Sequence, residues 1–316
     1  MLRFHRVAPY IAVSLAVLFW GLSFVATKIA LESLTLFPLL SLRFIFAASV
    51  FLALMVWRGF PRFTRAEHLQ IFLAALFQPG LYFLCETSGL QYTSASKASL
   101  IIATIPILVL ALSIMFLKER LTAAIVGGMI VSVIGVALLI VGDAQFQWAF
   151  EGSMIGDLLI LGAVLSMAIY TVTLKNVTKQ RSPLDITGML MCYGALFFTP
   201  PFLRELPHIQ WNAVYGHSWL ALACLALFAT LGAFLSFNYA LSKLSASRTA
   251  IFLNCVPVVT TFGAWGILDE RLHPVQFLGG GLVLAAVYLT NFVGKDNHTQ
   301  SQPQSVMPSQ LADSEI

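Results

Sequence analysis

The feature that most constrains this chain is a succession of ten long apolar segments separated by short polar stretches. They cover residues 8–31, 38–57, 68–90, 95–117, 122–141, 153–174, 185–203, 218–241, 249–268 and 274–294. A helix needs about 20 apolar residues to cross the hydrocarbon of a bilayer, and a helix satisfies its own backbone polar groups there. The pattern therefore predicts an all-α integral membrane protein with ten transmembrane helices.

The composition excludes several other classes of protein. Of the 316 residues, 59% are hydrophobic and 10% are charged, whereas a soluble domain carries about 25% charged residues. The Lys and Arg residues are dispersed among the loops, so no nucleic-acid partner is expected. All four cysteines (Cys85, Cys192, Cys224 and Cys255) fall in apolar segments. We therefore expect neither disulfides nor a zinc site.

The distribution of Lys and Arg predicts the orientation in the membrane, because cytoplasmic loops carry an excess of these residues. With the N-terminus inside, the cytoplasmic ends of the spans carry Arg3, Arg6, Arg58, Arg62, Arg65, Lys118, Arg120, Lys175, Lys179, Arg181, Lys243, Arg248 and Lys295. The other side carries Lys97, Arg204 and Arg271. Both termini are thus predicted to be cytoplasmic, in a cell membrane such as the bacterial inner membrane.

The two ends of the chain are interpreted separately. The first apolar segment is longer than the apolar region of a typical signal peptide and has no clear cleavage site, so we interpret it as a retained span. Residues 296–316 are polar throughout and are predicted to form a disordered cytoplasmic tail.

An internal repeat relates the two halves of the chain, 8–141 and 153–294. A shift of 151 residues pairs Ser94-Ala95-Ser96 with Ser245-Ala246-Ser247, Pro106 with Pro257, and Glu119-Arg120-Leu121 with Glu270-Arg271-Leu272. A slightly smaller shift pairs Ala16-Val17-Leu18 with Ala163-Val164-Leu165, and Lys28 with Lys175. Because each half holds five spans, an odd number, the second half enters the membrane inverted. Inverted repeats of this kind underlie many alternating-access carriers.

Three motifs resemble an EamA-type repeat of the drug/metabolite transporter superfamily. They are Trp20-Gly21-Leu22-Ser23-Phe24, Leu90-Gln91-Tyr92-Thr93-Ser94-Ala95, and Pro106 followed by Glu119-Arg120-Leu121. The resemblance covers about residues 8–295. It implies ten helices, cytoplasmic termini and a central cavity lined by both halves. Members of this superfamily export amino acids, nucleotide precursors, drugs and other metabolites, and some import, so the resemblance does not fix the substrate.

Polar side chains inside the spans give the candidate substrate-binding residues, because burying such groups in hydrocarbon is costly. Gln78, Tyr82 and Glu86 recur at i, i+4 and i+8 and so form one stripe on the third span. Other spans from both halves carry comparable groups. The predicted substrate-binding residues are Trp20, Ser23, Gln78, Tyr82, Glu86, Tyr170 and Asn254.

Ionisable residues and prolines within the spans are predicted to form ion pairs or gates. Glu86 could make a structural ion pair with Lys28 or Arg43, or it could titrate during transport or bind a cationic group. Pro106 and Pro257 occupy matched positions in the two halves and are expected to permit kinks in mid-span.

Two further sets of residues are expected to have structural roles. Glu119 and Glu270, with Arg120 and Arg271, lie at span ends, where turn or interfacial ion pairs are the simplest expectation. The glycine clusters Gly127-Gly128 and Gly279-Gly280-Gly281 are expected to permit close helix packing.

No sequence motif for catalysis is present: the chain lacks H-E-x-x-H, G-x-S-x-G and Walker A patterns. We therefore expect no catalytic residue, metal or cofactor, and uphill transport would depend on proton or counter-solute coupling. The sequence favours a secondary transporter that exports a small metabolite, amino acid or drug-like solute by alternating access. Its partners would be that solute and membrane lipid. A membrane-embedded enzyme for lipid-linked substrates and a non-transporting scaffold remain alternatives.

Overall fold

The computed structural model describes residues 2–92, 98, 101–119, 122–141, 154–268 and 273–293. These residues form ten helical segments, as the apolar pattern predicts. Seven of them are long and apolar enough to cross a membrane, and Ile105–Leu117 and Ala123–Leu138 are shorter apolar helices. The predicted tail at 296–316, and Arg120, Glu270 and Arg271, lie outside the described residues.

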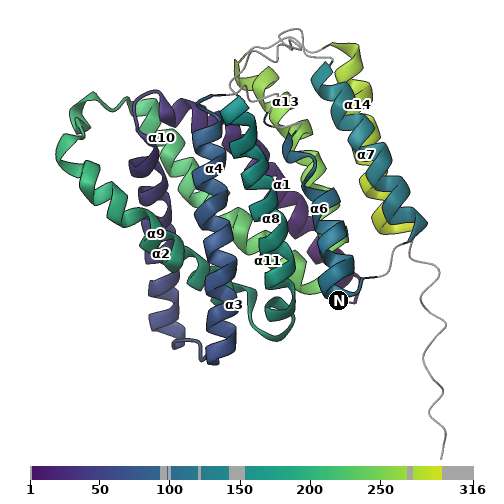
Figure 1. Cartoon of the computed structure of the whole chain (residues 1–316), viewed down its shortest axis with the longest axis horizontal. Coiled ribbons are helices and arrows are strands. Elements are labelled where there is room, and N and C mark those ends of the chain that lie inside the picture. Colours follow the sequence, from purple (N-terminus) through teal and green to yellow (C-terminus); the bar gives the residue numbers. More distant parts are fainter. Residues whose placement is uncertain are drawn as a thin grey trace, which may run out of the picture.

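Each half contributes five of the helical segments (Figure 1). The first half consists of α1 (Leu2–Leu31), α2 (Leu36–Arg58), α3 (Arg65–Ala75) continued by η1 (Leu76–Leu81) and α4 (Tyr82–Gly89), α6 (Ile105–Leu112) continued by η2 (Ser113–Leu117), and α7 (Ala123–Val141). The second half consists of α8 (Met154–Gln180), α9 (Pro183–Glu205), α10 (Gly216–Cys224) continued by η5 (Leu225–Gly232) and α11 (Ala233–Lys243), α12 (Ala246–Ile251) continued by η6 (Phe252–Asn254) and α13 (Cys255–Leu268), and α14 (Pro274–Tyr288) continued by η7 (Leu289–Val293). Two short turns, Leu206–His208 and Trp211–Ala213, follow α9.

Irregular turns occur at positions of the helices that the internal repeat relates. The third helix of each half contains a widened turn, η1 in the first half and η5 in the second, and the 151-residue shift superposes the two turns. In η1 the backbone of Gln78 is extended, with φ −145° and ψ 118°. The helical conformation is disfavoured there because Pro79 follows.

The matched prolines stand where helices restart. Pro106 is in the first turn of α6, after a turn at 103–104, and Pro257 is in the first turn of α13, directly after η6. A proline is tolerated in the first turn because its missing N–H has no helical acceptor there. The sequence predicted kinks at these positions, and the structure instead shows each span divided just before its proline.

The first described helix, α1, begins and the last, α14 with η7, ends at the same end of the bundle, here named the terminal face (Figure 1). Arg181, which follows α8, pairs at this face with Glu67 near the start of α3, with 2.6 Å between Nε and Oε1. At the opposite face, Glu32 after α1 lies 2.8 Å from His217 Nε2 at the start of α10. Contacts between the halves therefore exist at both ends of the bundle.

The helices α7 and α14 form a pair at the edge of the bundle (Figure 1). A Cβ added at Gly135 would lie 2.7 Å from the backbone oxygen of Gly279 and 2.9 Å from the backbone nitrogen of Val283. One added at Gly128 would overlap the Thr290 hydroxyl, at 1.8 Å. This seam confirms the packing role predicted for Gly128 and Gly279. Gly127 and Gly281 have open space around them, so the close packing predicted for these two glycines was wrong.

Apolar side chains cover much of the outer surface, as a lipid environment requires. Large examples are exposed on helices of both halves, including Val56 on α2, Leu220 on α10 and Leu278 on α14. The interior is aromatic where the halves meet: Phe83 of α4 and Phe234 of α11 lie 6.1 Å apart between ring centroids.

Candidate functional site

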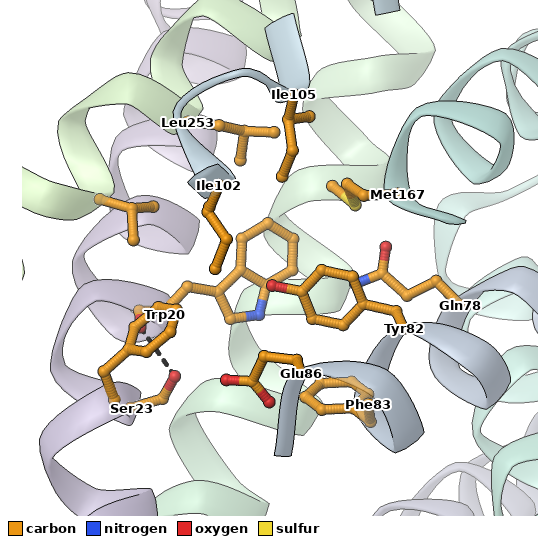
Figure 2. A pocket seen from close by; sticks show the side chains of 12 residues that line it. Trp20, Ser23, Gln78, Tyr82, Phe83, Glu86, Ile102, Ile105, Met167 and Leu253 are labelled. Carbon is orange, nitrogen blue, oxygen red and sulfur yellow. Dashed lines mark hydrogen bonds between the residues drawn. The ribbon is translucent and has the colours of Figure 1, made fainter. Parts of the chain in front are cut away.

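A cavity lies between the two halves and is lined by residues from five spans (Figure 2). The lining residues are Trp20, Ser23, Phe24, Gln78, Tyr82, Phe83, Glu86, Ile102, Ile105, Met167, Leu253 and Val256. Five of these were predicted as substrate-binding residues from the sequence: Trp20, Ser23, Gln78, Tyr82 and Glu86. The structure thus brings α1 and the η1–α4 stripe together on one cavity.

The cavity is nearly filled by its own side chains. Its volume is about 30 Å³, enough for a few waters at most. The space is therefore too small for a metabolite. A solute could enter only if the walls moved apart.

Six of the lining residues form three pairs that the internal repeat relates. The 151-residue shift superposes Ile102 on Leu253 and Ile105 on Val256, and the smaller shift superposes Trp20 on Met167. Of these six residues Trp20 was predicted, whereas polarity within the spans gave no indication of Ile102, Ile105, Met167, Leu253 or Val256. Applying the repeat to Trp20 would have found Met167. Because both members of each pair face the same space, the cavity lies where the two halves meet symmetrically.

The polar wall, by contrast, comes from one half. The positions equivalent to Gln78, Tyr82 and Glu86 in the second half are Ala229, Ala233 and Phe237, none of which carries a polar side chain. The architecture of the cavity is therefore symmetric, while its chemistry is not. A solute would meet hydrogen-bonding groups on one side and apolar surface on the other.

Trp20 is fixed in place by contacts with the second half. Its indole nitrogen donates to the carbonyl of Ala229 at 3.1 Å, and its ring packs edge-on against Phe234 at 5.6 Å between centroids. Gly21 lets α1 approach α13 closely, since an added Cβ would lie 2.5 Å from Val259. With its N–H already used, Trp20 offers a solute its aromatic face.

Glu86 and Gln78 place hydrogen-bond acceptors at the cavity. The Glu86 side chain is 5% exposed, and its carboxylate accepts a hydrogen bond from Thr87 Oγ1 at 3.0 Å. Gln78 is 2% exposed, and its Oε1 has no hydrogen-bond partner among the described residues. A buried carbonyl oxygen without a partner is unusual in proteins. These oxygens can accept hydrogen bonds from a ligand.

The predicted partners of Glu86 lie outside the cavity. Arg43, on α2, is 1% exposed. Its Nε donates to Thr230 Oγ1 at 3.1 Å, and its guanidinium lies 4.8 Å from the ring centroid of Phe83. Arg43 interacts electrostatically with Glu86. Within the described part of the chain, however, no N–O contact of 4.0 Å or less joins Glu86 to Arg43 or to the exposed Lys28.

Tyr170 and Asn254, also predicted as substrate-binding residues, are not among the lining residues. Tyr170 donates its hydroxyl to Asn238 Oδ1 at 2.6 Å, and the Asn238 amide donates to Thr187 Oγ1 at 3.0 Å, so that α8, α11 and α9 are joined. The Asn254 amide donates to Ser132 Oγ of α7 at 2.8 Å. Both side chains thus join helices within the bundle. Pro106 and Pro257 each directly follow a lining residue.

The Asn238 network provides a test of how these spans are held together. Replacing Asn238 by Leu is expected to lower the free energy of unfolding by about 1–3 kcal/mol, because the fully buried Tyr170 hydroxyl loses its acceptor. Denaturant unfolding of the purified protein would measure the change. The exposed Asn212 provides the control Asn212→Leu. Equal stability of both variants and the parent would contradict the prediction.

Besides the cavity residues, the chain carries cysteines and other side chains that could bind a metal ion. Cys85, Cys192, Cys224 and Cys255 are free thiols. Within the ranges that the structure describes, no group of three or more His, Cys, Asp or Glu side chains is placed to hold a metal ion.

Comparison with known proteins gives consistent results. The model of the EamA-like transporter family matches residues 8–141 and 154–292. The uncharacterized transporter YetK of Bacillus subtilis is 27% identical over 287 residues, which cover 90% of this chain and 87% of YetK. An uncharacterized transporter of Archaeoglobus fulgidus is 29% identical over 289 residues, covering 89% of this chain and 97% of that protein.

Two further similarities concern function and fold separately. A probable terminal-alkyne amino-acid exporter of Streptantibioticus cattleyicolor is 28% identical over 287 residues, covering 89% of this chain and 92% of the exporter. A crystal structure with 19% identity superposes with a TM-score of 0.75 over 90% of this chain and 98% of that one, which shows that the fold is shared.

Proposed function

Because the chain belongs to the EamA-like transporter family, we propose that it exports a small solute by alternating access between its two five-helix halves. The chain is a multi-pass membrane transporter and not an enzyme. The observation that carries the proposal is the cavity between the halves, lined by the repeat-related pairs Trp20 with Met167, Ile102 with Leu253 and Ile105 with Val256. Two inverted halves around one site can exchange conformations, so that an opening to one face becomes an opening to the other.

The size of the cavity supports a mechanism with moving walls. A space for a few waters (about 30 Å³ in all) holds no metabolite, so the halves separate at one face when a solute enters. The restarted helices after Pro106 and Pro257 directly flank the lining residues Ile105 and Val256. In our proposal these divided spans absorb the motion, in both halves alike.

The chemistry of the cavity favours a solute that carries a cationic, hydrogen-bond-donating group such as an ammonium. Glu86 provides a negative charge, and Trp20 and Tyr82 provide aromatic faces that attract cations. None of the twelve lining residues, all of them described, is Lys, Arg or His. The positive potential of Arg43 opposes this attraction, but its guanidinium is held by Thr230 and Phe83 outside the cavity. One relative is named a probable terminal-alkyne amino-acid exporter, and amino acids carry such an ammonium group.

The orientation follows from the excess of Lys and Arg at one end of the spans. In our proposal the terminal face is cytoplasmic, so both termini lie in the cytoplasm and solutes enter the cavity from that side. We further propose that the protein resides in a bacterial inner membrane and uses a proton or counter-solute gradient, since the sequence has no motif for ATP binding.

Thiol accessibility tests the proposed cavity. Single cysteines at Ser23 and Tyr82, in a chain whose four native cysteines are replaced, are expected to react with a small polar maleimide and to be protected by phenethylammonium. A cysteine at the fully buried Tyr170 is the matched control and should react much more slowly. If all three positions were equally inert, a non-transporting scaffold would be favoured instead.

A further inference from the structure

Two motifs of the internal repeat have no role in the cavity: Ser-Ala-Ser and Glu-Arg-Leu. In the structure, Glu119 of the Glu-Arg-Leu motif in the first half contacts the Ser-Ala-Ser motif of the second half. Glu119 Oε1 accepts a hydrogen bond from the backbone N–H of Ala246 at 2.8 Å, and Glu119 Oε2 accepts from the N–H and the hydroxyl of Ser247 at 3.2 Å and 2.7 Å. Sequence analysis predicted a turn or interfacial ion pair for Glu119, whereas its carboxylate binds a segment 127 residues away.

The segment that Glu119 holds is held from its other side as well. Lys175 of α8, 4% exposed, donates from Nζ to the backbone carbonyls of Leu241 and Leu244. Around the link between α11 and α12, Lys175 of the second half therefore holds backbone carbonyls, and Glu119 of the first half holds backbone N–H groups. Glu119 and Lys175 also attract each other electrostatically. This arrangement is here named the Glu119 latch and comprises Glu119, Lys175, Leu241, Leu244, Ala246 and Ser247.

The Glu119 latch lies at the terminal face and is connected directly to both cavity walls. Leu253, which lines the cavity, follows Ser247 by six residues, about 9 Å along a helix. Ile105 lines the cavity at the start of α6, and the same span continues through η2 to Glu119. The latch therefore ties together, beyond the cavity, the two segments that carry the lining pairs Ile102 with Leu253 and Ile105 with Val256.

The other end of the molecule differs. Lys28 is the repeat counterpart of Lys175, and Leu90 is the counterpart of Leu241. Lys28 is exposed, and no hydrogen bond joins it to Leu90 or to any other described residue. Among the described residues, the lysine contact with this carbonyl is therefore made at the terminal face and unmade at the opposite face, while the counterparts of Leu244, Ala246, Ser247 and Glu119 lie outside the described residues. Such a difference is expected of one conformation in an alternating-access cycle.

We infer that the Glu119 latch closes the cavity at the terminal face and breaks each time the transporter opens there. The inference rests on the proposed function and adds to it the gating residues Glu119 and Ser247. The contact can open because Glu119 is only half-buried, so water can replace its hydrogen bonds as the two segments separate. While it is closed, the charge-assisted bonds hold the first half to the second at the mouth of the cavity.

Labelling from one side of the membrane tests the inference without knowledge of the substrate. The reporter is a single cysteine at Ser23, and the probe is a membrane-impermeant sulfonated maleimide applied at the terminal face of oriented vesicles. Glu119→Gln is expected to raise the labelling rate several-fold, because the neutral amide binds the N–H groups of Ala246 and Ser247 less strongly. Glu67→Gln is the matched control, since Glu67 also joins the halves at this face but away from the cavity walls. Equal labelling in the parent and both variants, or an equal rise in both variants, would overturn the inference.

A cross-link provides the opposite test and remains informative if Glu119→Gln folds poorly. Cysteines at Glu119 and Ser247, oxidised to a disulfide, are expected to suppress labelling of the Ser23 cysteine from the terminal face, and a reductant should restore it. Unchanged labelling after complete cross-linking would overturn the latch while leaving the transporter proposal intact. If the Ser23 cysteine were inert from both faces in every variant, the wet cavity itself, and with it the proposed function, would be refuted.

Discussion

Replacing Glu86 by Gln is expected to weaken binding of phenethylammonium about 100-fold, because removing one partner of a desolvated charge pair typically costs 2–5 kcal/mol. The carboxylate is 5% exposed and is the acidic group among the residues that line the cavity. Equilibrium binding to the purified transporter would measure the change. Phenylethanol has the same aromatic body without the charge, and its affinity should change little between the parent and Glu86→Gln.

The control for this prediction is Glu32→Gln. Glu32 is exposed and pairs with His217 at the opposite face, so its loss removes a carboxylate from the protein without altering the cavity. If phenylethanol and phenethylammonium bound the parent equally well, or if Na⁺ alone displaced phenethylammonium completely, Glu86 would not be the recognition site for an organic cation.

The same variant also separates the two roles left open for Glu86. If the carboxylate serves mainly to balance the buried charge of Arg43, Glu86→Gln should destabilise the protein, and Arg43→Met combined with Glu86→Gln should restore stability. If the carboxylate contacts the solute, binding falls in both the single and the double variant. Denaturant unfolding and binding, measured on the same samples, distinguish these outcomes.

A second large effect is expected at the seam between α7 and α14. Replacing Gly135 by Leu should lower the free energy of unfolding by about 3 kcal/mol, because the added side chain would meet the backbone of Gly279 and Val283, which cannot move aside. Small residues permit close helix packing in membranes, where van der Waals contact replaces the hydrophobic effect. Unfolding in a mild detergent, titrated with a denaturing one, would measure the loss.

Gly127→Leu is the matched control for the seam. Gly127 lies on the same helix but faces open space, so the substitution should leave stability nearly unchanged and add apolar surface toward lipid. If Gly127→Leu destabilised the protein as much as Gly135→Leu, the effect would arise from glycine-to-leucine exchange in this helix in general, and the proposed seam would be wrong.

The sequence by itself determined the architecture of this protein. The lengths of the apolar segments fixed ten helices, because hydrocarbon thickness and helical rise are properties of single segments. The polar stripe was recognisable as well: Gln78, Tyr82 and Glu86 face one cavity although the helix is interrupted at Gln78. Of the packing glycines, Gly128 and Gly279 were recognisable from the sequence, since small residues have few other uses in lipid, whereas Gly135 was recognised only from the structure.

Only the tertiary structure decided which distant groups meet. Arg43 binds Thr230 and Phe83 instead of pairing directly with Glu86, and Glu119 binds Ser247 of the other half. Tyr170 joins helices through Asn238 and does not line the cavity. Hydropathy and spacing report on one helix at a time, whereas these partners depend on how each helix is rotated and placed against the others. That arrangement comes from side-chain packing over the whole bundle, which no single segment encodes.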